Sequence, residues 1–376
     1  MTTIALLAML ALVPAQAGAA AKVDRVVTSK GAPVEGEVQK ESYKEVVVKV
    51  GSSTQTVPAA DVVRVEYWDA PGAFRGAVAS AEAEKWSEAI SALASAEDSA
   101  NSKEKGAMKP RAWFPVHLAY YRALCMANVG QSEKALVNLE KLRKDPAFKE
   151  NRFLAEAFRL TLEIYREKND TAKMEETEKE IDGAPGEIKT KLQMLSRVAR
   201  AESFYDKNKY DEAKKLFETL ATAPDADLQA QGTAGVLKCL GGLKDVGGLD
   251  SYAKKVLATS QQNGLLLLAN NALADQAFEK KAWGAARDLY IQSVVRYNPG
   301  RTAGGVEREH EKALWKLGQC YEALLEAAKE PALKNAVSAM ASSTFRELSS
   351  EYPSGKYREE AAAKAVKYEP KKEEKK

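Results

Sequence analysis

Two patterns of hydrophobic and polar residues divide the chain. Between Val23 and Trp68, β-branched residues alternate with polar residues in short stretches that turn residues separate. Alternation with a period of two is typical of strands that bury one face. It predicts five strands, at Val23–Thr28, Val34–Val38, Glu45–Val50, Gln55–Val57 and Val62–Tyr67. After Gly72 the apolar residues recur three and four positions apart, which predicts amphipathic helices as far as Tyr368.

The strand-rich segment, residues 22–69, predicts a small β-module. Five short strands in so little sequence favour a strongly bent barrel. A strand, a glycine turn, a second strand beginning near Glu35-Gly36 and a closing hydrophobic strand resemble the order found in SH3-like and Sm-like folds. A module of this size is marginally stable by itself, so we expect it to pack against the first helices. It lacks a cluster of basic and aromatic residues, so RNA binding is not expected.

A motif repeats through the helical part of the chain. An aromatic or turn residue precedes two polar residues and an alanine, and large apolar residues follow four and about seven positions later. The alanines are Ala89, Ala135, Ala213 and Ala286, and prolines follow at Pro146, Pro224 and Pro299. The alanines are separated by 46, 78 and 73 residues, so each of the two longer intervals holds two units. The third unit is degenerate, because Met174 stands where the alanine is expected.

This motif resembles the second helix of a tetratricopeptide repeat (TPR). Leu317, Gly318 and Tyr321 also match the Leu-Gly-x-x-Tyr signature of the first helix in that family. The resemblance implies a mainly α fold, a right-handed α-solenoid of TPR-like helical hairpins, preceded by the small SH3/Sm-like β-module. It covers residues 71–368 with about seven helical pairs. The units exceed the usual period of about 34 residues, so longer helices or loops must absorb the excess.

Residues 1–21 have the pattern of a signal peptide. The apolar stretch Ile4–Val13 is too short to span a bilayer, and small residues follow it, which predicts cleavage at Ala17 or at Ala19. No Lys or Arg precedes this stretch, so an uncut membrane anchor is the alternative. We expect an exported protein, periplasmic or secreted, with no membrane insertion after cleavage. The mixed charges of residues 369–376 predict a disordered tail.

The sequence lacks the patterns of common catalytic sites. It has no HExxH, phosphate-loop or GxSxG motif, and only two histidines. The nearest approach to a metal site is Glu307, His310 and Glu311, which share one face of a predicted helix. The neighbouring Arg308 and Lys312 favour a solvated charged surface instead. We therefore expect a protein that is not an enzyme and has no cofactor or metal; a hydrolase acting through its histidines is the weakest hypothesis.

Charge and cysteine spacing narrow the class further. The formal net charge of +3 comes from 56 basic and 53 acidic residues, whereas a nucleic-acid-binding protein concentrates basic residues on one surface. Cys125, Cys239 and Cys320 are far apart and lie within apolar helical stretches. This spacing predicts buried side chains at helix interfaces rather than a disulfide framework or a zinc site.

The expected function is therefore binding. The TPR resemblance implies that first helices line a concave groove for peptides or protein segments. Aligning the units on their turns directs these residues into it: His117, Tyr120, Arg159, Glu163, Arg166, Glu202, Asn271, Asp275, Trp315 and Gln319. We consider Trp315 the strongest candidate, because an exposed tryptophan gains most from burial against a partner. The leading hypothesis is a cell-envelope scaffold or adaptor that binds another envelope protein or peptide segment; the alternative is a cell-wall or polysaccharide-binding module.

Overall fold

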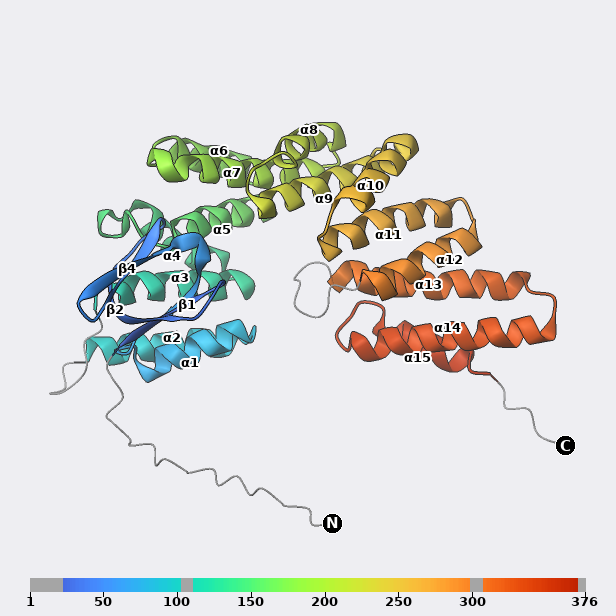
Figure 1. The fold of residues 1–376 in the computed structure, drawn as a ribbon, viewed down its shortest axis with the longest axis horizontal. Coiled ribbons are helices and arrows are strands. Elements are labelled where there is room, and N and C mark those ends of the chain that lie inside the picture. The colour runs from blue at the N-terminus through green and yellow to red at the C-terminus, as the bar shows by residue number, and fades with distance from the viewer. Residues whose placement is uncertain (1–22, 103–110, 298–306, 371–376) are drawn as a thin grey trace, which may run out of the picture. The chain divides into compact units, whose positions relative to one another are not determined.

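The computed structural model describes residues 23–102, 111–297 and 307–370, which form two compact units (Figure 1). The N-terminal unit extends to Leu192 and the C-terminal unit begins at Gln193. The described part is mainly helical, with fifteen α-helices and one small antiparallel sheet at its beginning. The predicted signal peptide and the last six residues of the predicted tail lie outside the described residues.

The five predicted strands are confirmed. They are β1 (Asp24–Thr28), β2 (Val34–Glu41), β3 (Glu45–Val50), β4 (Ser53–Pro58) and β5 (Val62–Glu66). Their spatial order is β4-β3-β2-β1-β5, and every neighbouring pair is antiparallel. A single 3-10 turn, Ala59–Asp61, connects β4 to β5. The alternation places five valines in a common core: Val26, Val46, Val48, Val57 and Val62.

Strand β2 bends so that it serves both halves of the sheet. Its first part pairs with β1 and its second part pairs with β3, with a shift of register between Val38 and Lys40. Gly36 stands where β2 passes closest to β3. A Cβ atom at this position would lie 2.3 Å from the carbonyl oxygen of Lys49, so only glycine allows the approach.

The helices follow one another in pairs. The N-terminal unit contains α1 (Gly72–Glu82), α2 (Trp86–Asn101), α3 (Trp113–Asn128), α4 (Ser132–Lys144), α5 (Leu154–Glu167) and α6 (Thr171–Asp182). Helix α7 (Gly186–Asp206) contains the boundary between the units. The C-terminal unit continues with α8 (Tyr210–Leu220), α9 (Ala226–Gly242), α10 (Val246–Thr259), α11 (Asn263–Glu279), α12 (Trp283–Ile291), α13 (Glu307–Ala327), α14 (Pro331–Glu351) and α15 (Arg358–Lys367). Part of the extra length of the units is helical, because α14 extends over 21 residues from Pro331.

Six of the turns within these pairs share one backbone conformation. Each has one residue with positive φ, at Glu84, Gly130, Asn169, Asn208, Lys244 and Lys281. The N–H of that residue bonds the carbonyl three positions back, and the next N–H bonds the carbonyl five positions back. These two bonds define the Schellman motif that ends a helix. The positive-φ residues lie 46, 39, 39, 36 and 37 positions apart, so the turns repeat at the intervals that the alanines predict.

A buried residue follows each of these turns at the same distance. Five positions after the residue with positive φ stand Ala89, Ala135, Met174, Ala213, Leu249 and Ala286. All six are buried. A small side chain at this point allows the two helices of a pair to approach closely. Met174 and Leu249 show that larger side chains are accommodated in the third and fifth pairs.

Gly318 should be required for close packing in the last pair. A Cβ atom at this position of α13 would lie 2.3 Å from the ring of Phe345 on α14, and Phe345 is fully buried. We expect Gly318→Ala to lower the free energy of unfolding of the C-terminal unit by about 1–3 kcal/mol, because the ring must move. Gly284→Ala on α12 is the control, since its added methyl meets nothing within 4 Å and removes only flexibility. Urea denaturation of both variants measures the difference, and equal midpoints would contradict the packing argument.

Candidate functional site

A groove of about 720 Å³ lies in the C-terminal unit. It is lined mainly by the first helices of successive pairs, with the turn between α9 and α10 at one side. Helix α11 contributes the largest share of the lining: Leu268, Asn271, Ala272, Asp275, Gln276 and Glu279. Tyr205 at the end of α7, Leu237 and Lys238 of α9, and Glu309 and Lys312 of α13 complete the same surface. Two residues predicted from sequence, Asn271 and Asp275, therefore lie together in one groove.

Asp275 connects α11 to the two helices that follow it. Its Oδ1 accepts a hydrogen bond of 2.5 Å from the hydroxyl of Tyr290, and its Oδ2 lies 2.7 Å from Nζ of Lys312. Burial disfavours the charge on Lys312, but the nearby Asp275 and Glu309 outweigh that effect and raise the pKa of Lys312. Burial and Asp275 together raise the pKa of Tyr290. The Asp275 carboxylate and the Lys312 ammonium group thus form an ion pair of fixed position in the wall of the groove.

Asn271 presents an unsatisfied polar atom in the groove lining. Its side chain is 3% exposed, and its Nδ2 donates a 3.0 Å hydrogen bond to the backbone carbonyl of Glu309. Its Oδ1 has no hydrogen-bond partner among the residues that the structure describes. A buried polar atom without a partner costs about 1–3 kcal/mol. The Asn271 side chain thus fixes α11 to α13 through its Nδ2, and its Oδ1 remains a buried acceptor that no described donor satisfies.

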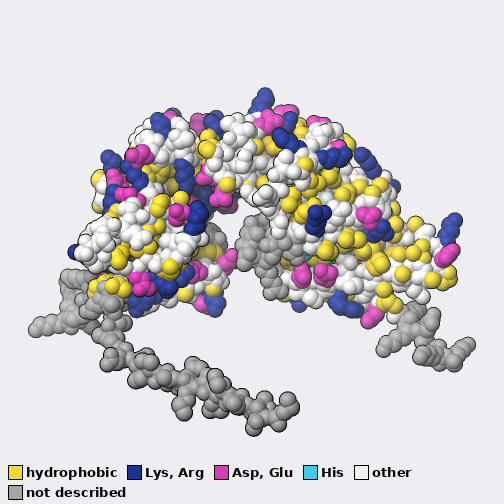
Figure 2. All heavy atoms as spheres, viewed as in Figure 1, with side chains coloured by type: hydrophobic (Ala, Val, Ile, Leu, Met, Phe, Trp, Pro, Cys, Tyr) yellow, Lys and Arg dark blue, Asp and Glu magenta, His cyan; other side chains and the backbone are white. Residues whose placement is uncertain are grey.

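The charges of the groove are mixed. Lys238 and Lys244 are exposed and form no ion pair with any described residue, whereas Asp245 caps α10 through the N–H of Gly248. Glu279 is an exposed acidic residue at the same surface. Beyond the groove, basic and acidic side chains are interspersed over both units on the face shown in Figure 2. The groove therefore offers hydrogen-bonding and ionic groups of both signs beside its apolar residues.

The predicted residues of α5 form their own ion pairs. Arg159 pairs with Glu156 at 2.8 Å and with Glu163 at 2.9 Å, and the three side chains are about two-fifths exposed. Arg166 on the same helix is half-buried, as is Glu202 on α7. These four predicted residues do not belong to the lining of the groove in the C-terminal unit.

The expectation that Trp315 is exposed is wrong. Its side chain is 7% exposed and stacks on Tyr357 with ring centres 4.9 Å apart. Lys364 of α15 lies over the Trp315 ring, with its Nζ 5.3 Å from the ring centre. Helix α15 follows the last pair and covers this position, which the repeat pattern does not indicate. Gln319, one turn further along α13, is half-buried with no partner for its Oε1 among the described residues.

Helix α13 contributes two residues to the groove that the repeat pattern does not indicate. Glu309 and Lys312 line the groove from the first turns of this helix, one to two turns before the predicted positions. Counting groove positions back from the turn that follows each helix misplaces Glu309 and Lys312, because α13 has 21 residues, four more than α11. The first turns of α13 therefore lie further from that turn than the first turns of α11 do. The length of the apolar pattern before that turn was the signal that could have found them.

The side chains of His310 and of the three cysteines are buried in the fold. His310 is 1% exposed, with Nδ1 2.6 Å from the hydroxyl of Tyr352 and Nε2 3.2 Å from the carbonyl of Val294. Glu311 accepts the N–H of Tyr357. No group of three metal-ligating residues occurs within the described ranges. All three cysteines are buried and unpaired, as predicted, and burial raises the pKa of the Cys320 thiol to about 12.

His117 and Tyr120 lie in the N-terminal unit, against the β-module. His117 is 2% exposed, and its Nε2 is 2.7 Å from a carboxylate oxygen of Glu41 at the end of β2. The same oxygen accepts a 2.6 Å hydrogen bond from the hydroxyl of Tyr67. Tyr120 is half-buried and stacks on Phe153, with ring centres 4.0 Å apart. The β-module thus packs against the helices, as its small size predicts, and covers the place where a ligand was expected.

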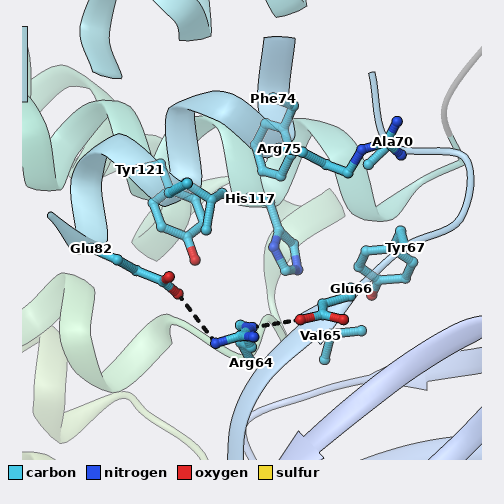
Figure 3. Close-up of a pocket in the computed structure, with 12 residues that line it drawn as sticks. Arg64, Val65, Glu66, Tyr67, Ala70, Phe74, Arg75, Glu82, His117 and Tyr121 are labelled. Atoms are coloured by element: carbon cyan, nitrogen blue, oxygen red, sulfur yellow. Dashed lines mark hydrogen bonds and ion pairs between the residues drawn. The ribbon is translucent and has the colours of Figure 1, made fainter. Parts of the chain in front are cut away.

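A second cavity lies beside His117, between β5, α1 and α3. Its volume is about 250 Å³, and Phe74, Tyr121, Tyr67 and His117 form much of its wall (Figure 3). Arg64 stands at its edge between Glu66, at 2.7 Å, and Glu82, at 3.7 Å. The cavity shares no residue with the groove of the C-terminal unit.

The chain matches no protein-family model, and no curated protein matches it. Among the described helices, none combines the length and apolar character that crossing a membrane requires.

Proposed function

We propose that the protein is a non-catalytic scaffold that binds an extended segment of a partner protein in the groove of the C-terminal unit. The observation that carries this proposal is the groove itself, which consecutive first helices line with apolar residues and exposed charges of both signs. A polypeptide offers apolar and charged side chains together with backbone N–H groups at regular intervals, so an extended segment complements such a lining. Tyr205 is the single aromatic residue of the described lining, so the groove is poor in rings on which sugars could stack. This composition favours a polypeptide over the alternative, a polysaccharide.

The repeated turn supports membership of the TPR-like class. Six Schellman turns with a buried residue five positions later reproduce the motif that suggested the resemblance. In a right-handed solenoid of such hairpins the first helices share one face, which is the arrangement the groove requires. The strand order β4-β3-β2-β1-β5, with a 3-10 turn before β5, supports an SH3/Sm-like assignment for the β-module. We further propose that the scaffold is exported and acts in the cell envelope, on the pattern of residues 1–21.

Reversing the free positive charges of the groove should weaken partner binding. A photo-reactive residue in place of Ala272, which lines the groove, crosslinks the partner and identifies the bound segment by mass spectrometry. We expect the double variant Lys238→Glu/Lys244→Glu to weaken the affinity for that segment at least fivefold, because rim charges steer and orient a charged partner. Titration of the labelled segment, followed by fluorescence anisotropy, measures the change.

The matched control is a second pair of reversals, Lys215→Glu/Lys255→Glu, at lysines on α8 and α10 that are exposed and outside the groove lining. It makes the same change of charge, so it should leave the affinity unchanged. Equal effects of the control and the double variant, or a crosslinked segment that does not bind in solution, would contradict the assignment of the groove.

A further inference from the structure

The cavity of the N-terminal unit has a polar atom that the fold leaves without a partner. His117 is almost completely buried, and its Nε2 faces the Glu41 carboxylate. Burial by itself would raise the pKa of Glu41, but the charge and hydrogen bond of His117, with Arg152 and Tyr67, outweigh burial and lower it to about 2. An ionised carboxylate only accepts hydrogen bonds, so the proton of the His117 ring resides on Nε2.

The other nitrogen of this ring, Nδ1, bonds no described residue. It carries a lone pair in the neutral imidazole and an N–H in the imidazolium. The hydroxyl of Tyr121, which lines the same cavity, is also without a hydrogen-bond partner among the described residues, although its side chain is half-buried. Figure 3 shows both side chains in the wall of the cavity. A ligand group that both donates and accepts hydrogen bonds would complement Nδ1 in either form of the imidazole. The same group would also bond the hydroxyl of Tyr121.

The rest of the cavity wall favours a ligand with a flat, apolar ring. Val65, Ala70, Phe74 and Val78 contribute apolar or aromatic surface. A protein cavity of about 150 Å³ accommodates benzene, so a cavity of about 250 Å³ has room for one aromatic ring with a substituent. An ion of a few atoms would leave most of this apolar surface uncovered, and a larger, drug-like molecule would not fit in a cavity of this volume.

The rim adds one free charge. Arg64 is neutralised by Glu66 and Glu82, whereas Arg75 on α1 is exposed and forms no ion pair with a described residue. Arg75 lies along the edge of the cavity in Figure 3. Its guanidinium can receive a carboxylate or a carbonyl oxygen from the part of a ligand that remains outside.

We propose that this cavity binds a phenol ring, with its hydroxyl directed at Nδ1 of His117 and the hydroxyl of Tyr121, and with an anionic or carbonyl group at Arg75. Tyrosine has this chemistry, either as the free amino acid or as a residue of a polypeptide. The site is independent of the function proposed for the groove, because the two share no residue and lie in different units.

Two probes that differ by one hydroxyl test the proposal. N-acetyl-L-tyrosinamide and N-acetyl-L-phenylalaninamide are titrated against the purified protein by ligand-detected NMR. We expect the tyrosine probe to bind about tenfold more tightly, because the phenylalanine probe leaves both polar atoms of the wall unsatisfied. Free L-tyrosine is the third probe: tighter binding than the blocked amide indicates the free amino acid as ligand, and weaker binding indicates a residue of a polypeptide.

The variant Ala79→Phe places a ring in the cavity from an exposed position on α1, so it should abolish binding without disturbing the fold. Ala83→Phe, one turn further and outside the lining, is the matched control and should bind normally. Equal affinity for the two blocked probes, or unaltered binding by the Ala79→Phe protein, would overturn the proposal. Circular dichroism of both variants confirms that they are folded.

Discussion

Replacing Arg111 with alanine should lower the free energy of unfolding of the N-terminal unit by about 3–5 kcal/mol, because it leaves two buried carboxylates without a counter-charge. Asp24 on β1 is fully buried and Asp69 after β5 is 3% exposed. Arg111 Nη2 lies 2.5 Å from Asp24 Oδ1 and 3.1 Å from Asp69 Oδ1, and its Nε donates to Asp69 Oδ2 at 3.2 Å. Burial would raise the pKa of Asp69, but the hydrogen bonds and charge of Arg111 outweigh it and lower the pKa.

The same cluster connects the β-module to the helices. Arg111 lies two residues before the start of α3, and Trp113 in the first turn of α3 donates its indole N–H to Asp69. The loss of stability should therefore appear in the sheet and in α3 together. Hydrogen–deuterium exchange of peptides from both elements, combined with urea denaturation, measures it.

Arg159→Ala provides the control. Arg159 also pairs with two carboxylates, but its side chain and those of its partners are about two-fifths exposed. Exposed ion pairs contribute about 1 kcal/mol or less. A loss of stability in Arg111→Ala no larger than that in Arg159→Ala would show that burial does not amplify this interaction.

The sequence predicts the elements well because their signals are local. Strand β3 buries alternate residues, and its inward valines Val46 and Val48 belong to the core that the alternation implies. The helical pairs are equally visible in the spacing of their alanines. The shared turn conformation is less apparent, because Glu84, Lys244 and Lys281 adopt a left-handed backbone without being glycine or asparagine. Hydrogen bonds to preceding helix carbonyls hold these residues there.

The candidate sites depend on contacts that sequence spacing does not contain. Asn271 and Asp275 could be placed by counting residues along one helix. Trp315 could not, because the stacking residue Tyr357 lies 42 positions away and outside the repeat. The surroundings of His117 could not be placed either, because its partner Glu41 lies 76 positions earlier, on a strand of the β-module. A candidate site in this fold is therefore predictable only where one helix supplies most of it.

Glu41→Gln should also destabilise the N-terminal unit strongly, and the effect should depend on pH. The Glu41 carboxylate receives the hydroxyl of Tyr67, the Nε2 proton of His117 and, at 3.4 Å, the guanidinium of Arg152. Arg152 also donates to the carbonyls of Val62 and Val63 on β5, so one carboxylate joins β2 and β5 to the helices. A neutral amide cannot replace the charge, and we expect a loss of about 3 kcal/mol at neutral pH.

The sign of the pH dependence follows from the direction of the pKa shift. The pKa of Glu41 is about 2 in the folded protein and 4.5 without the fold. Its ionised form is favoured by folding, so its contribution is complete above pH 4.5 and is lost as the pH falls toward 2. The difference between the two pKa values corresponds to about 3 kcal/mol. The wild-type unit should therefore lose this stability on acidification, whereas Glu41→Gln has already lost it.

Urea denaturation at pH 7 and at pH 3 measures both consequences. We expect the gap in stability between wild type and Glu41→Gln to be large at pH 7 and to narrow at pH 3, because the wild-type carboxylate then loses most of its advantage over the unfolded chain. Glu156→Gln, which removes a half-exposed partner of Arg159, should show a small gap at both pH values. A gap for Glu41→Gln that stays constant between pH 7 and pH 3 would mean that packing of the side chain, and not its charge, joins the sheet to the helices.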